Sequence, residues 1–438
     1  MTTLERPIGD RALHREEVAR RDLGHTDVSP VVARTIVALF LLLIAVVPAV
    51  ELLAVRSRSA AGVASAWSQL VADVEPAPGP PPTTLWTRLL ASNRVVLERL
   101  TGFERTLEDE SVIGRALRPP AQALMTGSLG AGNERVYPGR DGWLFYRPDV
   151  EYVTGQAFLD PARLRRRVES ANEWSIPPAP DPRPALLRFR DDLAARGIAL
   201  VVVPAPTKAG VHPDRLSGVV APAESGILRN PSFAALVDEL SRAGLEVFDP
   251  SGILRTGRTA APQYLATDTH WRPEVMESVA VALSARLRAS VPAAADPGYR
   301  IERASVTNIG DITRMLDLPA TTALYPAEEV WLRRVLQPDG TPWRAERDSE
   351  VLLLGDSFAN IYSLQSMGWG TSAGLAEHLS LALGRPLDRI VQNDAGAYAP
   401  REILARDPDR LTGKRVVIYQ FAERELAFGD WKVLRIPR

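Results

Sequence analysis

The chain has 438 residues, of which 45% are apolar and 24% charged, and 52 basic residues nearly balance 53 acidic ones. This composition is typical of a folded protein with room for up to about three domains, and a net charge of −1 gives no field that would draw the chain to nucleic acid. The sequence contains no cysteine, which excludes disulfides, thiolate nucleophiles and cysteine–metal sites. Any catalysis must therefore use oxygen nucleophiles, carboxylates, lysine or the five histidines.

The first expected element is a transmembrane signal anchor at residues 34–56. Between Arg34 and Arg56 the only charged residue is Glu51, and a helix of this length spans about 30 Å, the thickness of the hydrocarbon core of a bilayer. A cleavable signal peptide is the alternative, because Ala64-Ser65-Ala66 offers a cleavage site after the run. With an uncleaved anchor, we expect residues 1–33 to form a cytoplasmic tail and the rest of the chain to lie outside the cell membrane.

Residues 57–134 are expected to form a stalk that contains helices and a proline-rich spacer. Ser57 to Ala72 could form a short helix, and the prolines of Glu75 to Thr84 require an extended segment. Apolar residues recur at helical spacing from Leu85 to Met125, and we expect Arg118-Pro119-Pro120 to break that helix.

From residue 135 to 438 the pattern changes to short apolar strands that alternate with amphipathic helices. The expected strands are Ala199 to Pro204, Glu246 to Phe248, Val351 to Leu354, Arg389 to Gln392 and Arg415 to Phe421. The expected helices are Pro184 to Arg196, Ser232 to Ala243, Glu274 to Ala289 and Thr371 to Leu383. Continuous apolar strands separated by helices predict a three-layer α/β domain, with a parallel sheet covered on both faces.

The segment LLLGDSF places Ser357 just beyond a buried strand. Such sheets carry their sites at the carboxyl ends of the strands, and we expect a helix over Ala359 to Leu364 directly afterwards. A serine becomes a nucleophile only beside a base. Taken alone, the G-D-S turn is a weak signal and favours a turn in which Asp356 or Ser357 caps that helix.

The segment ATDTHWRP offers the base. Asp268 and His270 are two residues apart, and in an extended segment their side chains point to one side. The carboxylate would accept the Nδ1–H of His270 and leave Nε2 facing a serine. The alternative is a turn histidine bonded to the start of a helix, which Pro273 would begin.

Together, GDSF and DTHW resemble the SGNH hydrolase-like domain of the AlgJ/AlgX alginate O-acetyltransferase family, in which the D-x-H pair precedes the serine. Further blocks match this family in the same order: GRDGWLFYRPD, VVVPAPTKAGVHPDRL, FDPSGIL, NIYSLQSMGWGTSAGLAEHL and QFAERELAFGDWK. The resemblance covers about residues 135–435. It implies a flavodoxin-like SGNH fold and a membrane-anchored O-acetyltransferase of an extracytoplasmic polysaccharide, alginate or another exopolysaccharide.

By this resemblance, Ser357 is the nucleophile that becomes acetylated, His270 is the general base and acid, and Asp268 orients His270. The acetyl donor would be a multi-spanning membrane-bound O-acyltransferase of the AlgI type, since coenzyme A is confined to the cytoplasm. The resemblance also implies a single-pass protein of the inner (cytoplasmic) membrane with a periplasmic catalytic domain. No cofactor and no metal ion are expected.

Three further residues are possible substrate or oxyanion contacts. Asn393 follows an expected strand and could supply an oxyanion donor, with a turn asparagine as the alternative. Lys208 follows another and could contact a polar sugar, or be a solvated loop lysine. Tyr362 could line the pocket, or pack in the core.

Two other functions remain open at this stage. A polysaccharide O-acetylesterase would use the same triad with water as the acceptor. A non-catalytic sugar-binding subunit of an export complex would not need the triad.

Overall fold

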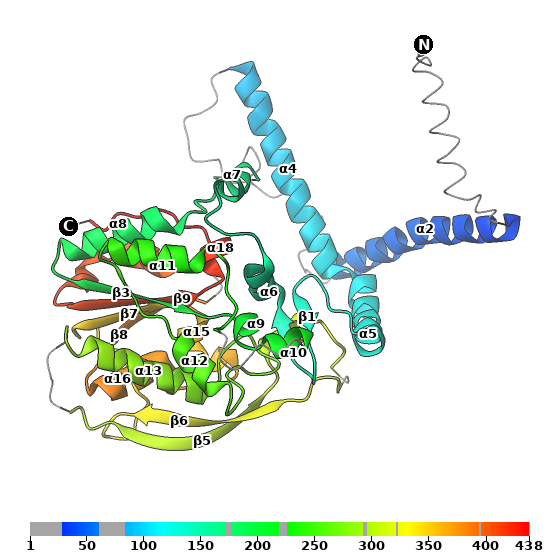
Figure 1. Cartoon of the computed structure of the whole chain (residues 1–438). Helices are drawn as coiled ribbons and strands as arrows, with labels where there is room; N and C mark the ends of the chain where they lie inside the picture. Colours follow the sequence, from blue (N-terminus) through cyan, green and yellow to red (C-terminus); the bar gives the residue numbers. More distant parts are fainter. Residues whose placement is uncertain are drawn as a thin grey trace, which may run out of the picture. The chain divides into compact units, whose positions relative to one another are not determined.

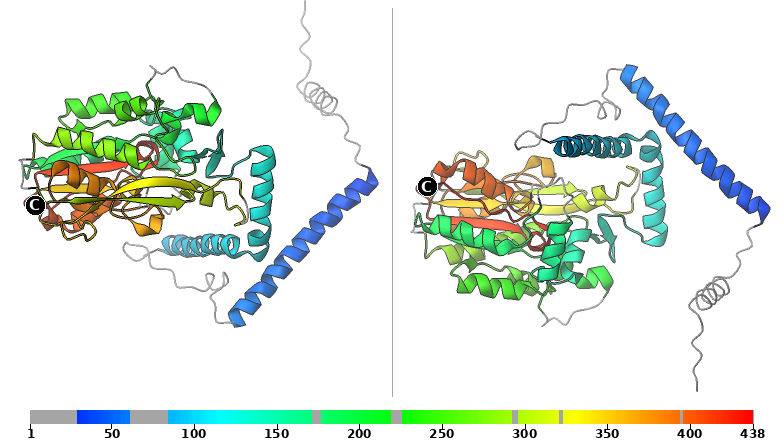
Figure 2. Two further views of the ribbon diagram at one scale, coloured as in Figure 1. Left: turned by 90° about the horizontal axis from the view of Figure 1, so that it is seen from below. Right: turned by 90° about the horizontal axis from the view of Figure 1, so that it is seen from above.

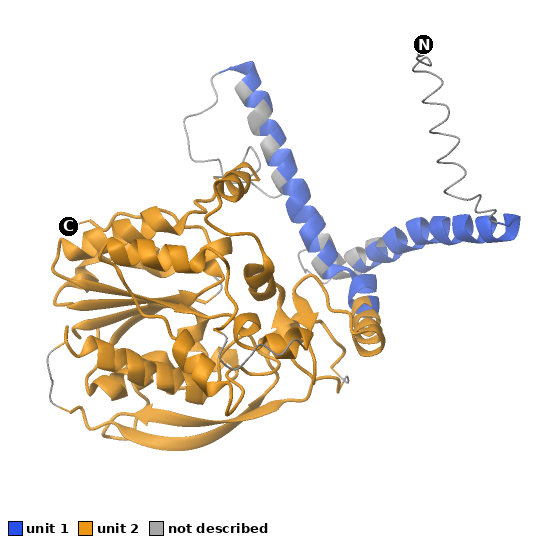
Figure 3. Cartoon of the chain, in the orientation of Figure 1, with its two compact units in different colours: residues 1–117 blue, residues 118–438 orange. Residues whose placement is uncertain are grey.

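The computed structural model describes residues 29–60, 84–170, 177–218, 226–291, 296–320, 323–393 and 396–437. The chain divides into two compact units, residues 1–117 and 118–438, and the helix α5 runs across this division (Figure 3). The expected tail up to residue 28, and the expected spacer and most of the short helix before it at residues 61–83, lie outside the described residues.

The first unit contains the helix α2 (Pro30–Ala60) and the helix α4 (Leu85–Glu110). Within α2, the segment Pro30–Glu51 is long and apolar enough to cross a membrane, with a mean hydropathy of 2.6, and none of it is buried. An apolar helix that packs against no protein is what a membrane anchor requires.

The helix break in this region lies at Ser111 and not at the two prolines. Pro119 and Pro120 both lie inside α5 (Val112–Leu129), so the expected break at Arg118-Pro119-Pro120 is wrong. The Ser111 hydroxyl accepts a hydrogen bond from the Gly114 N–H (2.8 Å) and so caps the new helix. The carboxylate of Glu51 accepts from the N–H groups of Val112 (3.2 Å) and Ile113 (3.1 Å), two more donors without a partner inside α5.

The second unit is built on a parallel sheet of five strands, as the sequence predicts. The order is β4-β3-β9-β7-β8, and every pairing is parallel. The strands are β3 (Ala199–Ala205), β4 (Glu246–Val247), β7 (Val351–Gly355), β8 (Asp388–Val391) and β9 (Val416–Ala422). β9, the last strand in the sequence, lies between β3 and β7 in the sheet.

Helices cover both faces of the sheet, so that its strands are apolar on both sides (Figure 1). One face packs against α8 (Pro182–Ala194), α11 (Phe233–Arg242), α17 (Ala399–Arg406) and α18 (Glu425–Phe428). The other packs against α12 (Ser251–Gly257), α13 (Pro273–Leu287) and α16 (Leu375–Leu383). Alternate residues of each strand enter the two cores: in β7, Leu353 belongs to one and Leu354 to the other.

The remaining described elements are short or lie outside the sheet. The helices are α6 (Arg147–Thr154), α7 (Pro161–Glu169), α9 (Lys208–Val211), α10 (Pro213–Ser217), α14 (Asp311–Met315) and α15 (Ser357–Asn360). The 3₁₀ turns are η1 (Gln365–Met367) and η2 (Pro408–Leu411).

Two antiparallel ribbons add to the predicted architecture. One pairs β1 (Val136–Pro138) with β2 (Leu144–Tyr146), and the other pairs β5 (Arg300–Asn308) with β6 (Glu328–Leu336). The second lies on the side of α13 and α16 and is in front in the view from below (Figures 1 and 2). β5 buries no residue, so it lacks the apolar pattern by which a strand is predicted.

Candidate active site

Ser357 lies directly after the carboxyl end of β7. At Gly355, a Cβ would lie 2.8 Å from the Cβ of Ala359, so only glycine lets the helix turn this closely against the strand. α15 begins at Ser357 and ends at Asn360, earlier than the predicted span of Ala359 to Leu364. It begins early because the Asp356 carboxylate caps it, accepting from the Phe358 N–H (2.9 Å).

Asp356 also ties this turn to the neighbouring strand β9. Its carboxylate accepts from Gln420 Nε2 (2.8 Å) and from the Ala422 N–H (2.6 Å), while its own N–H donates to Gln420 Oε1 (3.2 Å). Three contacts to one strand and a cap on the helix hold the backbone around Ser357 in place.

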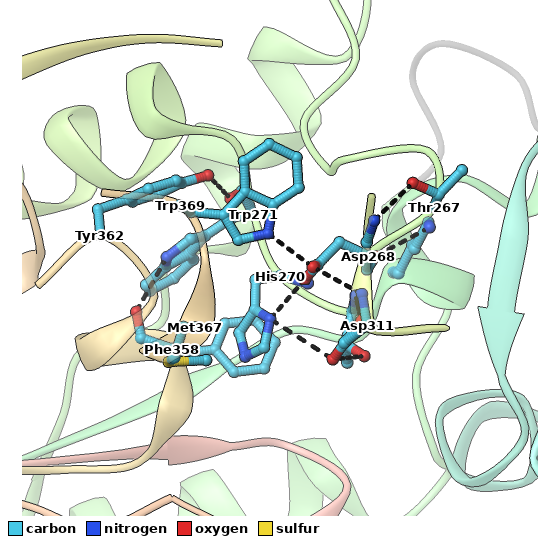
Figure 4. A network of polar contacts seen from close by, with 12 residues as sticks. Thr267, Asp268, His270, Trp271, Asp311, Phe358, Tyr362, Met367 and Trp369 are labelled. Carbon is cyan, nitrogen blue, oxygen red and sulfur yellow. Dashed lines mark hydrogen bonds and ion pairs between the residues drawn. The ribbon is translucent and has the colours of Figure 1, made fainter. Parts of the chain in front are cut away.

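The second segment of the site, Ala266 to Trp271, lies just before α13. Asp268 Oδ1 accepts from the Nδ1–H of His270 (2.7 Å) and from its backbone N–H (3.1 Å). Asp268 Oδ2 accepts from Trp369 Nε1 (2.8 Å) and from the Asp311 N–H (3.0 Å). The carboxylate is therefore fixed by four donors and presents Oδ1 to the imidazole (Figure 4).

Asp311, at the start of α14, is a second carboxylate beside this pair. It accepts from the N–H (2.7 Å) and the hydroxyl (2.8 Å) of Thr269, the residue between Asp268 and His270. Its Oδ2 lies 3.9 Å from His270 Nδ1. At Gly310 a Cβ would lie 2.1 Å from the carbonyl oxygen of Thr267, so this glycine is required for the close approach. The motif N-I-G-D gives no local sign of this role, and the sequence analysis missed it.

The two segments are bonded to each other through the residues that follow His270 and Ser357. Trp271 Nε1 donates to the carbonyl of Phe358 (3.2 Å), and the Tyr362 hydroxyl donates to the carbonyl of Trp271 (2.6 Å) (Figure 4). The rings of His270 and Phe358 are in contact, with centroids 4.8 Å apart. The histidine loop and the serine turn are thus held as one unit, although they lie far apart in the sequence.

Both segments open into one cavity of about 330 Å³ at the carboxyl end of the sheet. It is lined by Tyr146, Asp268, Thr269, His270, Asp311, Arg314, Met315, Ser357, Ile361, Ser366, Met367, Asn393 and Arg424. His270 Nε2 is buried and has no hydrogen-bond partner among the described residues. A neutral imidazole whose Nδ1–H is bound to a carboxylate has its lone pair on Nε2, the atom that a general base uses.

The charges around His270 stabilise its protonated imidazole. Burial acts to lower the pKa of His270, but the hydrogen bond and charge of Asp268 outweigh it, and the pKa is raised above its ordinary value of 6.5. Burial acts to raise the pKa of Asp268, but His270 holds it well below its usual range. Burial and the charge of Asp268 raise the pKa of Asp311 to about 6.

Among the residues that the structure describes, Asp268, His270 and Asp311 form a group that could hold a metal ion, since one ligand atom from each lies within 4.8 Å of the others. The hydrogen bonds are against this use. Each carboxylate oxygen of the two aspartates already accepts from an N–H or O–H group, and the Nδ1 of His270 donates to Asp268. A cation would have to displace these donors, so the arrangement fits a hydrogen-bonded pair better than a metal site.

The structure places the three other predicted residues differently. Asn393 lines the cavity, and its side chain lies between Asn360 Nδ2 (3.3 Å from Oδ1) and the sulfur of Met367 (3.4 Å from Nδ2). Tyr362 is fully buried and is not among the residues that line the cavity. Lys208 is also fully buried: its ammonium group donates to three backbone carbonyls and lies over the rings of Trp143 (5.1 Å) and Phe145 (5.3 Å), so it neither lines the cavity nor meets solvent as a loop lysine.

Arg424 is a cavity residue that the sequence analysis missed. It follows β9 and forms an ion pair with the buried Asp149 of α6 (3.0 Å). The guanidinium lies over the rings of Tyr146 (5.2 Å) and Phe358 (5.9 Å). Although burial acts to lower its pKa, Asp149 and other carboxylates hold it above the ordinary value. A fixed positive charge therefore lines the cavity that contains Ser357.

Comparison with known families agrees with this architecture. The model of the family described as "SGNH hydrolase-like domain, acetyltransferase AlgX" matches residues 136–423, which include both segments of the site. The chain is similar to a probable alginate O-acetylase AlgJ of Pseudomonas aeruginosa, 27% identical over 311 residues, covering 68% of this chain and 72% of that protein. The AlgJ of Azotobacter vinelandii, also described as a probable alginate O-acetylase, is 23% identical over 334 residues, covering 74% and 78%.

The fold is that of a solved relative as well. The structure of the O-acetyltransferase domain of Pseudomonas putida AlgJ aligns with a TM-score of 0.50 at 23% identity, covering 67% of this chain and 93% of that domain. Because the family model spans well over half of the chain, the chain belongs to the AlgX-type family of SGNH hydrolase-like acetyltransferases and is an O-acyltransferase.

Proposed function

We propose that this enzyme acetylates hydroxyl groups of an extracytoplasmic polysaccharide, with Ser357, His270 and Asp268 as its catalytic triad. The observation that carries the proposal is the state of His270: its Nδ1–H is bound to Asp268, and its Nε2, beside the cavity that Ser357 also lines, has no hydrogen-bond partner in the part of the chain that the structure describes. The relatives' description as probable alginate O-acetylases supports a polysaccharide acceptor, alginate or another exopolysaccharide.

In the first half of the reaction, His270 takes the proton of the Ser357 hydroxyl while its oxygen attacks the acetyl carbonyl of the donor. The donor's C–O bond breaks, and His270 returns the proton to the leaving oxygen. In the second half, His270 takes the proton of a sugar hydroxyl while the sugar oxygen attacks the acetyl carbonyl of acetyl-Ser357. The bond between that carbonyl carbon and the Ser357 oxygen breaks, and His270 returns the proton to Ser357. Each tetrahedral intermediate carries a negative oxygen, for which the Ser357 N–H and the Asn393 amide are the proposed donors.

The proposal includes a membrane location. The apolar segment Pro30–Glu51 would anchor the protein in the cytoplasmic membrane by a single pass, with the second unit in the periplasm. A donor that carries acetyl groups across the membrane is then needed, and a multi-spanning O-acyltransferase of the AlgI type is the proposed partner. Protease treatment of intact spheroplasts tests the location: the second unit should be digested while a cytoplasmic marker survives.

The activity is tested with purified protein, a small acetyl ester as donor and an oligosaccharide as acceptor. Wild-type protein should acetylate Ser357, detected by mass spectrometry of the peptide that contains it, and transfer the group to the sugar. Ser357→Ala should lower kcat/KM by at least about a thousand-fold, and Asp268→Asn by about a hundred-fold or more. Ser278→Ala, an exposed serine of α13, is the matched control and should retain wild-type turnover.

The products separate the possible functions. Acetylated sugar supports a transferase, whereas free acetate without acetylated sugar would mean that water is the acceptor and that the enzyme is an esterase. Turnover that is the same in Ser357→Ala as in wild type would refute the triad.

A further inference from the structure

Lys208 is a fully buried lysine whose ammonium group meets three backbone carbonyls. It is the first residue of α9, separated by two residues from the carboxyl end of β3, and its side chain is 0% exposed. Nζ donates to the carbonyls of Leu144 (2.6 Å), Ala266 (2.8 Å) and Asp268 (3.0 Å). A lysine has three N–H donors and no acceptor, so these bonds use the full capacity of the group.

Two of these carbonyls belong to the loop that carries the catalytic carboxylate. The third carbonyl is that of Leu144 in β2. The N–H of Leu144 also donates to the Ala266 carbonyl (2.8 Å). The N–H groups of the same loop bind a negative charge: the Glu328 carboxylate accepts from the N–H groups of Ala266 (3.0 Å) and Thr267 (2.9 Å). A buried cation thus binds the loop's carbonyls and a carboxylate binds its N–H groups, which leaves the Asp268 backbone little freedom to move.

Burying this ammonium group lowers the stability of the folded state. Burial disfavours the ammonium ion and lowers the pKa of Lys208 to about 7, although the carboxylate charges nearby act in the opposite direction. A methionine of similar length would fill much of the same space without a buried charge, but it would take the ammonium donor away from three carbonyls, and a buried acceptor that loses its donor is itself destabilising. The hydrogen bonds to the Asp268 loop are what such a replacement would remove.

We propose that Lys208 is a positioning residue of the acyl-transfer reaction: by binding the carbonyls of Ala266 and Asp268, it sets the orientation of the Asp268 carboxylate against His270. This inference rests on the proposed triad, because it acts through Asp268. It touches neither the substrate nor the reacting atoms, so its effect should appear in kcat rather than in the binding of a small donor.

Lys208→Met keeps the length of the side chain and removes its donors. In the full-length protein we expect kcat for hydrolysis of a small neutral acetyl ester to fall by about a hundred-fold, the scale of a small misplacement of a catalytic group, with KM nearly unchanged. Lys414→Met is the matched control. Lys414 is also buried and donates to the carbonyl of Ser349 (2.8 Å), but it precedes β9, at the end of the sheet opposite to the site. The Lys414→Met variant should have a lower free energy of unfolding than the wild type and the same kcat.

A chemical rescue separates positioning from folding. The chain has no cysteine, so after Lys208→Cys is introduced, 2-bromoethylamine alkylates that position alone in the unfolded protein and restores an ammonium group of nearly lysine length. Wild-type protein is carried through the same unfolding and refolding. We expect the alkylated protein to regain most of kcat, whereas the variant before alkylation should remain as impaired as Lys208→Met.

The pH dependence of kcat distinguishes a positioning role from a merely structural one, which would not change it. The sulfur atom makes the new amine less basic than that of lysine, so it loses a proton, and with it one of its three N–H donors, at lower pH. The fall of kcat on the alkaline side should therefore occur at lower pH in the alkylated protein than in the wild type. The ionisable groups that face Nζ from neighbouring elements are Asp149 of α6, His212 after α9, Asp268, Asp311 of α14 and Glu328 of β6. They are unchanged in the alkylated protein, so the shift reports the amine.

The outcomes are distinct. Wild-type kcat in Lys208→Met, or an alkaline limb that does not move after alkylation, would overturn the positioning role while the triad stands. Ester hydrolysis by wild-type protein that does not depend on Ser357 would refute the proposed function and this inference with it. Loss of kcat in Lys208→Met, recovery on alkylation and a displaced alkaline limb support it.

Discussion

Asp311 puts a second negative charge beside the Asp268–His270 pair, and this charge should be visible in the pH dependence of the reaction. Its ionised form stabilises the protonated imidazole and contributes to the raised pKa of His270. His270 must lose its proton to act as a base, so the acidic limb of kcat/KM follows this pKa. Removing the charge should lower the pKa and move the limb to lower pH.

Asp311→Asn makes this change with little disturbance, since an amide can still accept from the Thr269 N–H and donate to its hydroxyl oxygen. We expect the acidic limb to move down by about one pH unit or less, where one unit corresponds to about 1.4 kcal/mol. Asp317→Asn, an exposed aspartate with φ of 53° that asparagine tolerates, is the control for a change of net charge. A limb that moves equally in both variants would contradict a local effect of Asp311.

The three proposed triad residues could be selected from the sequence because each lies in a short segment with its own signal. Asp268 and His270 are two residues apart, and Ser357 follows an apolar strand and a glycine. Asp311 and Arg424 could not, because each reaches the site only after distant elements have packed. Lys208 was noticed for its place after a strand, but its burial depends on β2 and the Asp268 loop, which the strand pattern does not reveal.

The turn between β7 and α15 depends on one carboxylate, that of Asp356. It caps the helix that begins at Ser357 and binds two residues of β9. In Asp356→Asn the amide nitrogen would face either the Ala422 N–H, which would lose its acceptor, or the donors of Phe358 and Gln420, which would both lose theirs. Both Asp356→Ala and Asp356→Asn should therefore displace Ser357.

We expect either variant to lower kcat/KM by about a hundred-fold, on the same misplacement argument, and to lower the free energy of unfolding by about 1 kcal/mol or more. Asp160→Ala is the control, because Asp160 caps α7 in the same way by accepting from the Arg163 N–H (2.9 Å), on a helix with no buried residue. It should cost a similar capping energy and leave kcat/KM unchanged. Equal activity of the two capping variants would show that Asp356 is only a cap.

The parallel sheet and its main helices were predictable because their apolar residues are consecutive in strands and periodic in helices. The expected strand Val351 to Leu354 differs from β7 by one residue. The prolines misled the prediction of α5, where a serine cap and the Glu51 carboxylate decide the helix start. β5 was missed for the opposite reason: RIERASVTN carries charges on an exposed ribbon, and its pairing with β6 is made by backbone groups that the side-chain pattern does not report.

The division of the chain into two units predicts that the catalytic unit works without the anchor. A fragment of residues 111–438 keeps the Ser111 cap of α5 and all residues of the cavity. It should remain in the soluble fraction and hydrolyse a small acetyl ester with kcat/KM within about two-fold of the full chain, a difference of only a few tenths of a kcal/mol. Full-length protein should instead remain with the membranes after a salt wash.

In cells, the same fragment directed to the periplasm should acetylate little polysaccharide if the donor is a membrane protein that the anchor keeps nearby. Acetylation at the full-length level by the soluble fragment would contradict that part of the proposal. A fragment that folds but hydrolyses no ester would mean that the first unit contributes to the site.

The bonds from Asp356 to β9 also bear on when the enzyme becomes active during its synthesis. Asp268, His270 and Ser357 all precede β9, which begins only at Val416 and inserts between β3 and β7. A chain that emerges from its amino end therefore carries all three groups before the strand that fixes the serine turn exists. The turn that carries Ser357, the proposed nucleophile, is therefore fixed only after β9 has been synthesised and has inserted into the sheet.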